Sequence, residues 1–150
     1  MTAFSRRDLV CLVAAVATLP VSVSQVSAGT DAVELAIKGY DPVAFFTLGR
    51  PTKGLPEFAH DWDDLRYHFV SAQHRDLFKA DPTRYAPQFA NYCAMALTRG
   101  KTDEANPENW LVRDGKLYIF AKPIGPGLFQ QAYNENVAKA EANRALIQKH

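Results

Sequence analysis

The chain has 150 residues, and its 17 Lys and Arg against 16 Asp and Glu leave a formal net charge of +1 at neutral pH. A balance this close to neutrality gives no reason to expect nucleic acid or an anionic membrane surface as a partner. The two cysteines, Cys11 and Cys93, are too few for a disulfide framework, and the length suits one small domain.

The first 28 residues have the three parts of an export signal. The Arg6-Arg7 pair is a positive start, Leu9–Leu19 is an uncharged apolar run, and Val26-Ser27-Ala28 places small residues before a cleavage site. The run is too short to span a bilayer. We therefore expect residues 1–28 to be a signal peptide and residues 29–150 to be a globular domain without a stable membrane anchor, periplasmic or secreted.

The segment Ser5-Arg6-Arg7-Asp8-Leu9 resembles the twin-arginine export motif, which implies passage of the folded protein through the export machinery. The alternative is a chance arginine pair in a general secretory signal. Cleavage near Ala28 would leave 122 of the 150 residues, with 15 basic and 15 acidic side chains once Arg6, Arg7 and Asp8 are lost. Cys93 would then be the only thiol, so no intramolecular disulfide is expected.

The first predicted elements of the domain are a short strand over Val33–Ile37 and a short helix from Asp41-Pro42 to Phe46. Asp accepts hydrogen bonds from the free N–H groups at a helix start, and Pro suits the first turn because it has no N–H to satisfy. Alternating apolar side chains then predict a hairpin formed by Glu57–Trp62 and Arg66–Val70.

Helical signals follow the first hairpin. We expect Ser71 to cap a helix over Ala72–Ala80, and Asp81-Pro82 to start another short helix. The segment Asn91–Leu97 is short and apolar, and periodicity does not distinguish helix from strand there.

The last third of the chain contains the strongest hairpin signal. Asp114-Gly115 separates Leu111–Arg113 from Lys116–Phe120. Before it, Asn106-Pro107 is predicted to begin one more helical turn with Asn106 as its cap, and a C-terminal helix is expected after the break at 123–127. Two β-hairpins, short Pro-initiated helices and a C-terminal helix, without βαβ alternation, predict a small single α+β domain.

Three strings in the middle of the chain have a characteristic order: Lys38-Gly39-Tyr40-Asp41-Pro42-Val43-Ala44-Phe45-Phe46, then Ser71–Pro82, then Arg84–Phe89 with Tyr92-Cys93-Ala94. These strings resemble the exported branch of the YHS-domain family. Tyr67-His68-Phe69-Val70-Ser71 lies where that family has the segment from which it takes its name. The resemblance covers roughly Ile37–Phe120. The compact members of this family look like small metal-binding modules and are often attached to heavy-metal transporters or reductases, so the resemblance implies a metal-binding module.

The chain departs from the compact members at each of their thiols. Ala44, Val70 and His74 stand at those three positions, so the metal site cannot be carried over whole. His74 alone keeps a ligand-capable side chain, and Cys93 belongs to the longer exported branch.

Three side chains are candidates for a metal site: Cys93, His74 and His60. Helical spacing from Leu77 and Phe78 predicts that His74 points inward, and alternation with Phe58 and Trp62 predicts the same for His60. Two imidazoles and one thiolate suit copper or zinc. No tight ligand spacing supports the set. The alternatives are a packed, inert thiol and histidines that bond to backbone groups.

The leading prediction is a non-enzymatic periplasmic binding module for copper or zinc. One alternative is a thiol-dependent enzyme with Cys93 as nucleophile and His60 or His74 as base. The other is a structural or partner-binding domain without a metal. The sequence has no Gly-x-Ser-x-Gly, no glycine-rich phosphate loop and no His-Glu-x-x-His, so we nominate no other catalytic residues.

Overall fold

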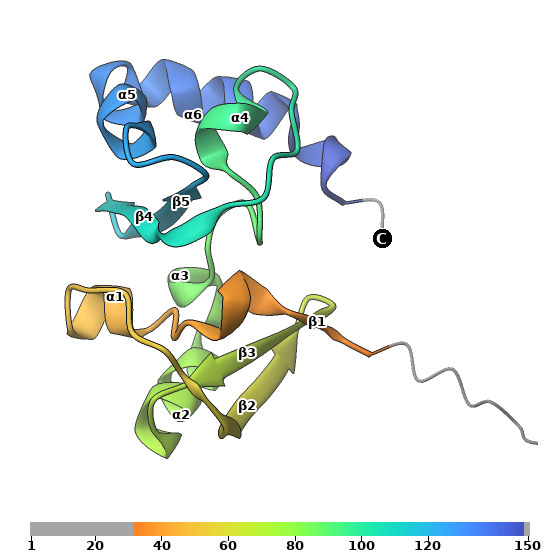
Figure 1. Cartoon of the computed structure of the whole chain (residues 1–150), viewed down its shortest axis with the longest axis vertical. Coiled ribbons are helices and arrows are strands. Elements are labelled where there is room, and N and C mark those ends of the chain that lie inside the picture. The colour runs from red at the N-terminus through yellow and green to blue at the C-terminus, as the bar shows by residue number, and fades with distance from the viewer. Residues whose placement is uncertain (1–31, 149–150) are drawn as a thin grey trace, which may run out of the picture. The chain divides into compact units, whose positions relative to one another are not determined.

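The computed structural model describes residues 32–148 (Figure 1), so the predicted signal peptide lies outside the described residues. Mixed strands and helices confirm the predicted α+β class. The elements in chain order are β1 (Glu34–Leu35), the 3-10 turn η1 (Ala36–Gly39), α1 (Ala44–Thr47), β2 (Leu55–Trp62), β3 (Leu65–Phe69), α2 (Ala72–Ala80), α3 (Pro82–Tyr85), α4 (Ala94–Leu97), β4 (Asn106–Arg113), β5 (Lys116–Phe120), α5 (Gly125–Gln131), α6 (Tyr133–Ala142) and the 3-10 turn η2 (Arg144–Leu146).

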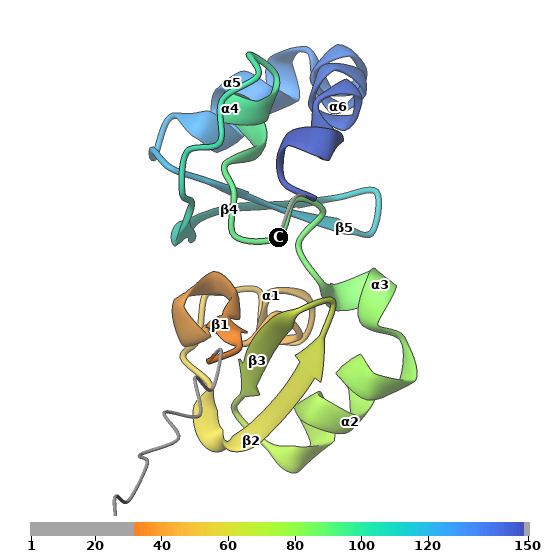
Figure 2. The same ribbon diagram turned by 90° about the vertical axis from the view of Figure 1, so that its right-hand side faces the viewer.

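The first sheet has the order β1-β3-β2, with β1 parallel and β2 antiparallel to β3. The predicted hairpin is confirmed, and Asp63 and Asp64 form its turn with φ values of 51° and 60°. Aspartate tolerates this left-handed region better than most residues. The helix α2 lies alongside the hairpin (Figure 2), and its Phe78 is buried against Tyr67, with ring centroids 4.7 Å apart.

The second sheet is the antiparallel pair β4-β5, joined by the predicted turn at Asp114 and Gly115. Figure 1 shows α4, α5 and α6 together on one side of this hairpin. The buried side chains of both sheets belong to one hydrophobic core. Pro87, which follows α3, forms an isolated β-bridge with Leu117 on β5. The core of residues 32–148 is therefore continuous.

Three local expectations are wrong. Asn106 begins β4 rather than a helix, and its Oδ1 accepts a bond from the N–H of Glu108 inside the strand. Pro107 fits there because the β4-β5 register is irregular between Asn106 and Trp110, where a residue without an N–H disturbs no regular pair. The predicted first strand shrinks to β1, since Ile37 enters the left-handed region. The helical spacing also predicts that Leu77 and Phe78 both lie on the core side of α2, but Leu77 is 37% exposed and only Phe78 is buried.

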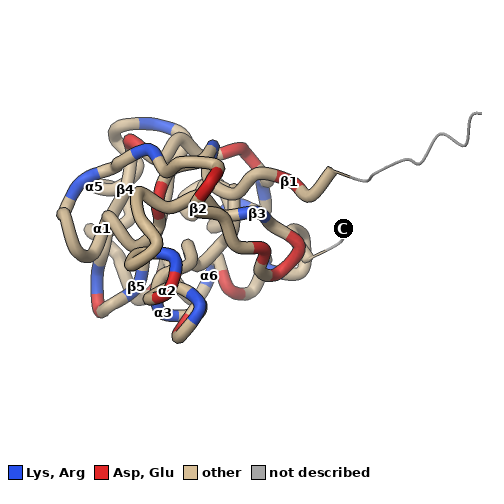
Figure 3. The backbone as a smooth tube through the Cα atoms, turned by 90° about the horizontal axis from the view of Figure 1, so that it is seen from below, with Lys and Arg blue, Asp and Glu red and all other residues tan. Residues whose placement is uncertain are grey.

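The helices α2 and α3 follow the predicted capping signals. Ser71 caps α2 over the predicted range, and Asp81 caps α3 by accepting from the N–H of Arg84. The C-terminal helix divides into α5 and α6 at Ala132. None of the helices in 32–148 has the length and apolar character needed to cross a membrane. Basic and acidic residues are interspersed along the chain (Figure 3).

Candidate functional site

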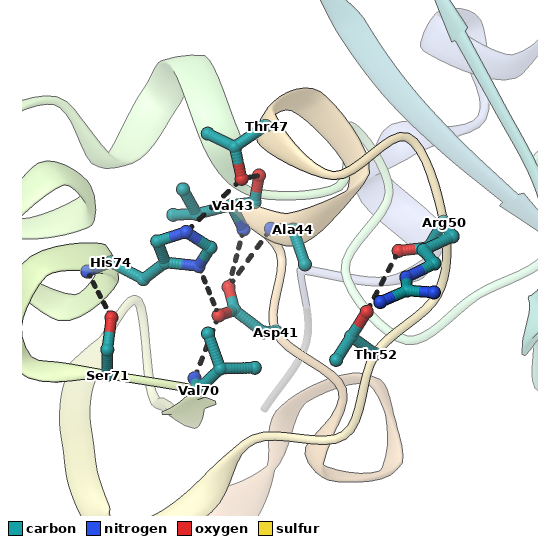
Figure 4. A network of polar contacts seen from close by, with 9 residues as sticks. All are labelled: Asp41, Val43, Ala44, Thr47, Arg50, Thr52, Val70, Ser71 and His74. Atoms are coloured by element: carbon teal, nitrogen blue, oxygen red, sulfur yellow. Dashed lines mark hydrogen bonds and ion pairs between the residues drawn. The ribbon is translucent and has the colours of Figure 1, made fainter.

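A carboxylate lies fully buried where α1, β3 and α2 meet. Asp41 has no exposed surface, and its two oxygens accept four hydrogen bonds (Figure 4). Oδ1 accepts from the N–H groups of Val43 (2.8 Å) and Ala44 (3.2 Å), in the turn that leads into α1. The helix begins at Ala44 rather than at Pro42, and Val43 occupies its cap position, so Asp41 bonds these N–H groups from two residues before the cap. Oδ2 accepts from the N–H of Val70 (2.9 Å) and from a ring nitrogen of His74 (2.6 Å). Helix capping alone therefore does not account for Asp41.

The imidazole of His74 is held at both nitrogens. The predicted inward orientation is confirmed, because His74 is only 9% exposed on α2. Nδ1 donates to Asp41, and Nε2 lies 3.2 Å from Oγ1 of Thr47, a residue on the exposed side of α1. The carboxylate thus fixes a proton on Nδ1, as it does beside many metal-ligating histidines.

Thr47, His74 and Asp41 stand in the order of a nucleophile, a base and an orienting carboxylate. However, the hydroxyl of Thr47 also donates to the carbonyl oxygen of Val43 at 3.1 Å, one turn back in the helix. Neither Thr47 nor His74 lines either of the two clefts described below. The hydrogen bonds of His74 connect α2 to Thr47 on α1 and to Asp41 before it.

Cys93 occupies a different environment. It is 5% exposed and stands directly before α4, where its sulfur accepts a hydrogen bond from the N–H of Ala96 at 3.4 Å. The helix α4 packs against α5, α6 and β5, whereas α2, which carries His74, packs against β2, β3 and α3. Cys93 therefore has the contacts of a packed side chain that also caps a helix.

The other two histidines lie on opposite faces of the first hairpin. His60 is half-buried and its ring meets that of Phe78 edge-on at 6.2 Å, so it faces the core as predicted. His68 is half-buried on the outer face and lines a shallow cleft with Asp61 and Arg66, and the half-buried His60 also contributes to the lining of this cleft. Burial lowers the pKa of His68, and the charges of Arg66 and Lys53 lower it further.

The three predicted metal ligands do not form a ready-made site. Within residues 32–148, no group of three or more His, Cys, Asp or Glu side chains is placed to hold a metal ion. His74 bonds Asp41 and Thr47, His60 packs on Phe78, and Cys93 caps α4. The residues present thus do not fit a His2Cys centre for copper or zinc in this arrangement.

A second feature was not anticipated from the sequence. A cleft of about 480 Å³ opens between the start of β1, the β2-β3 turn, the segment after α3 and the end of the chain around η2. Its lining includes Glu34, Trp62, Asp63, Asp64, Tyr67, Asn91, Tyr92 and Arg144. These side chains come from four separate segments with no characteristic spacing, so no sequence motif could have indicated the cleft.

Tyr67 is the most unusual residue of this lining. Its side chain is 1% exposed, yet its hydroxyl makes no hydrogen bond, although no fully enclosed polar side-chain atom among the described residues lacks a partner. The hydroxyl oxygen must therefore be the part of the residue that reaches the cleft. Burial and the nearby charge of Asp63 raise the pKa of Tyr67, so the hydroxyl stays protonated at neutral pH.

Comparisons with protein-family models, with curated proteins and with solved structures find no match for this chain. The resemblance to the YHS-domain family therefore remains a prediction from the sequence.

Proposed function

We propose that the mature chain is an exported binding module that holds a ligand without catalysing a reaction. The observation that carries this proposal is a contrast between two sets of polar groups. Asp41, His74 and Cys93, the groups best suited to chemistry, are buried and bonded internally. The Tyr67 hydroxyl, by comparison, is left without a partner at a cleft of a size typical for small ligands.

A transition metal is the ligand class implied by the family resemblance, with copper or zinc as candidates. A site built from Cys93, His74 and His60 would require Cys93 to give up its cap on α4 and His74 to turn from Thr47. The carboxylate behind His74 supports a ligating role for that residue alone, because such a partner fixes the ring orientation. We therefore propose the binding function independently of the metal.

The thiol-dependent enzyme is less well supported. A nucleophilic cysteine needs a base within hydrogen-bond reach and some access for substrate. Cys93 is nearly enclosed, and neither His60 nor His74 is bonded to it. A purely structural domain is the remaining alternative, and a ligand found in the cleft would exclude it.

The test is to purify the mature chain from the compartment to which it is exported and to determine its metal content and its intact mass under native conditions. We expect a bound small molecule that is released on unfolding. Stoichiometric copper or zinc that is lost in both Cys93→Ser and His74→Gln would instead support the metal site. A protein with neither metal nor bound ligand, from cells that process it normally, would contradict the binding function.

Export has its own test. Replacing Arg6 and Arg7 together by Lys keeps the positive charge but removes the twin-arginine pair. We expect the precursor to accumulate inside the cell, while the parent is processed near Ala28. Normal processing of the variant would indicate that the protein uses the general secretory route. An unprocessed parent protein would contradict export.

A further inference from the structure

The cleft has an unusual charge balance. Glu34, Asp63 and Asp64 line it, and none of the three forms an ion pair with another residue in 32–148. The cationic side chain in the lining, Arg144, is already engaged, because its guanidinium binds both carboxylate oxygens of Glu141 at 2.6 and 2.7 Å. The charge of Arg144 also acts on Asp63, but three carboxylates against this one paired guanidinium leave the lining with a net negative charge.

Aromatic and hydroxyl groups complete the lining. Trp62 is half-buried at the end of β2, and Tyr92 adds a second aromatic side chain. Aromatic rings attract cations, and quaternary ammonium groups are recognised in this way. The partnerless hydroxyl of Tyr67 offers one hydrogen bond to a polar group that reaches the base of the cleft.

Two other ligand classes fit less well. A metal ion needs carboxylates that converge on one point, and Glu34, Asp63 and Asp64 are not among any such group in the described part of the chain. An anion would meet three carboxylates, while the guanidinium that could attract it is paired with Glu141. Of the three ligand classes, a small organic cation therefore fits the lining best.

We propose that this cleft binds a small organic cation, with its charged group between the carboxylates of Asp63 and Asp64 and the ring of Trp62, and a polar group bonded to Tyr67. The inference rests on the proposed binding function and names its ligand class. In the lining, the carboxylates would attract the positive charge of the ligand, the ring of Trp62 would contact its cationic group, and the hydroxyl of Tyr67 would form a hydrogen bond with its polar group.

The test compares cations with neutral molecules of the same shape. The first pair is choline and 3,3-dimethyl-1-butanol, which share the hydroxyl and the branched head but differ in charge. The second pair is 1,4-diaminobutane and 1,4-butanediol. Binding to the mature chain is measured by calorimetry and by tryptophan fluorescence. We expect at least one cation to bind about tenfold more tightly than its neutral counterpart, with an affinity that falls as salt is added.

Variants assign the binding to the cleft. Asp63→Asn and Asp64→Asn keep side chains that tolerate the left-handed turn, and each should weaken the cation severalfold. Tyr67→Phe should also weaken it, without a change of charge. Glu57→Gln removes the same charge from an exposed position outside the cleft and should leave binding unchanged once added salt screens the general charge of the protein.

Three outcomes would overturn the inference. If both members of each pair bind equally and Tyr67→Phe weakens both, the cleft binds a ligand but does not prefer cations. Binding of Ca²⁺ with no binding of either amine would replace the ligand class by a metal ion. Failure of both cations to bind would also reject the proposed class, and the native mass of the purified protein would then decide the binding function separately.

Discussion

Nδ1 of His74 lies 2.6 Å from Oδ2 of Asp41, although 33 positions separate the two residues in the chain. The same carboxylate accepts bonds from the start of α1 and from Val70, which directly follows β3. One buried aspartate therefore bonds to the start of α1, to the residue that follows β3, and to α2, which lie at different places in the sequence. Such a group has no water to replace a lost partner, so its removal leaves several donors unsatisfied at once.

Two aspartates of this chain precede a proline, and they provide a matched pair. Asp41→Ala should lower the free energy of unfolding by about 3 kcal/mol or more, because it removes a buried hydrogen bond to His74 and leaves several buried backbone donors unpaired. Asp81→Ala should cost only about 1 kcal/mol, since the exposed Asp81 caps α3 and has no buried partner. Urea denaturation of both variants measures the difference. Equal costs would show that the contact with His74 adds nothing to the cap.

Gly54 lies where the chain passes close to β3. A Cβ at this position would lie 2.5 Å from the carbonyl oxygen of His68 and 2.5 Å from the backbone nitrogen of Phe69. Because these atoms belong to a paired strand, Gly54→Ala should destabilise the protein by about 1–3 kcal/mol.

Gly127 is the control for that substitution. It lies in α5 with open space around its Cα, so Gly127→Ala should stabilise the protein by about 0.5–1 kcal/mol through helix propensity. Thermal unfolding of both variants shows whether the two effects have opposite signs. A neutral Gly54→Ala would mean that the loop before β2 can move away from β3.

The elements that the sequence predicts well are those decided within a few residues. Ser71 bonds to a backbone N–H three positions away, and α2 begins and ends as expected. The turn at Asp114-Gly115 is equally local. Asn106 has the same kind of signal but begins a strand, because pairing with β5 determines its conformation. Tertiary pairing overrides a local cap in such cases.

The candidate site is less predictable for the same reason. His74 could be placed inward from its helical spacing, but its partner Asp41 is fully explained by capping when only the neighbouring residues are considered. An inward position for His60 and His74 does not specify which part of the core each one faces. The helix α2, which carries His74, packs against β2, β3 and α3, whereas α4, which follows Cys93, packs against β5, α5 and α6. The cleft depends on four segments whose proximity exists only in the folded chain.

His68 should contribute to the pH dependence of stability. Its pKa lies below the ordinary value of 6.5, first because of burial and then because of the charges of Arg66 and Lys53. As the pH falls through 6.5, the unfolded chain takes up a proton at His68 that the folded protein resists, so the free energy of unfolding decreases until the folded state is protonated too. His68→Gln should therefore lose less stability between about pH 7.5 and about pH 5 than the parent. Parallel curves for the two proteins would contradict this assignment.

The thiol of Cys93 should react only when the protein opens. It is 5% exposed, its sulfur accepts a bond from Ala96, and it belongs to the continuous core. In a protein that consists of residues 29–150, the predicted mature chain, we expect an aromatic disulfide reagent to react with Cys93 roughly 100-fold or more slowly than with Gln130→Cys, an exposed position on α5 placed in a Cys93→Ala background. The rate should rise with denaturant in step with unfolding and should not change with a chelator. Fast labelling of the folded parent would support the thiol enzyme, and labelling that a chelator releases would support a metal on Cys93.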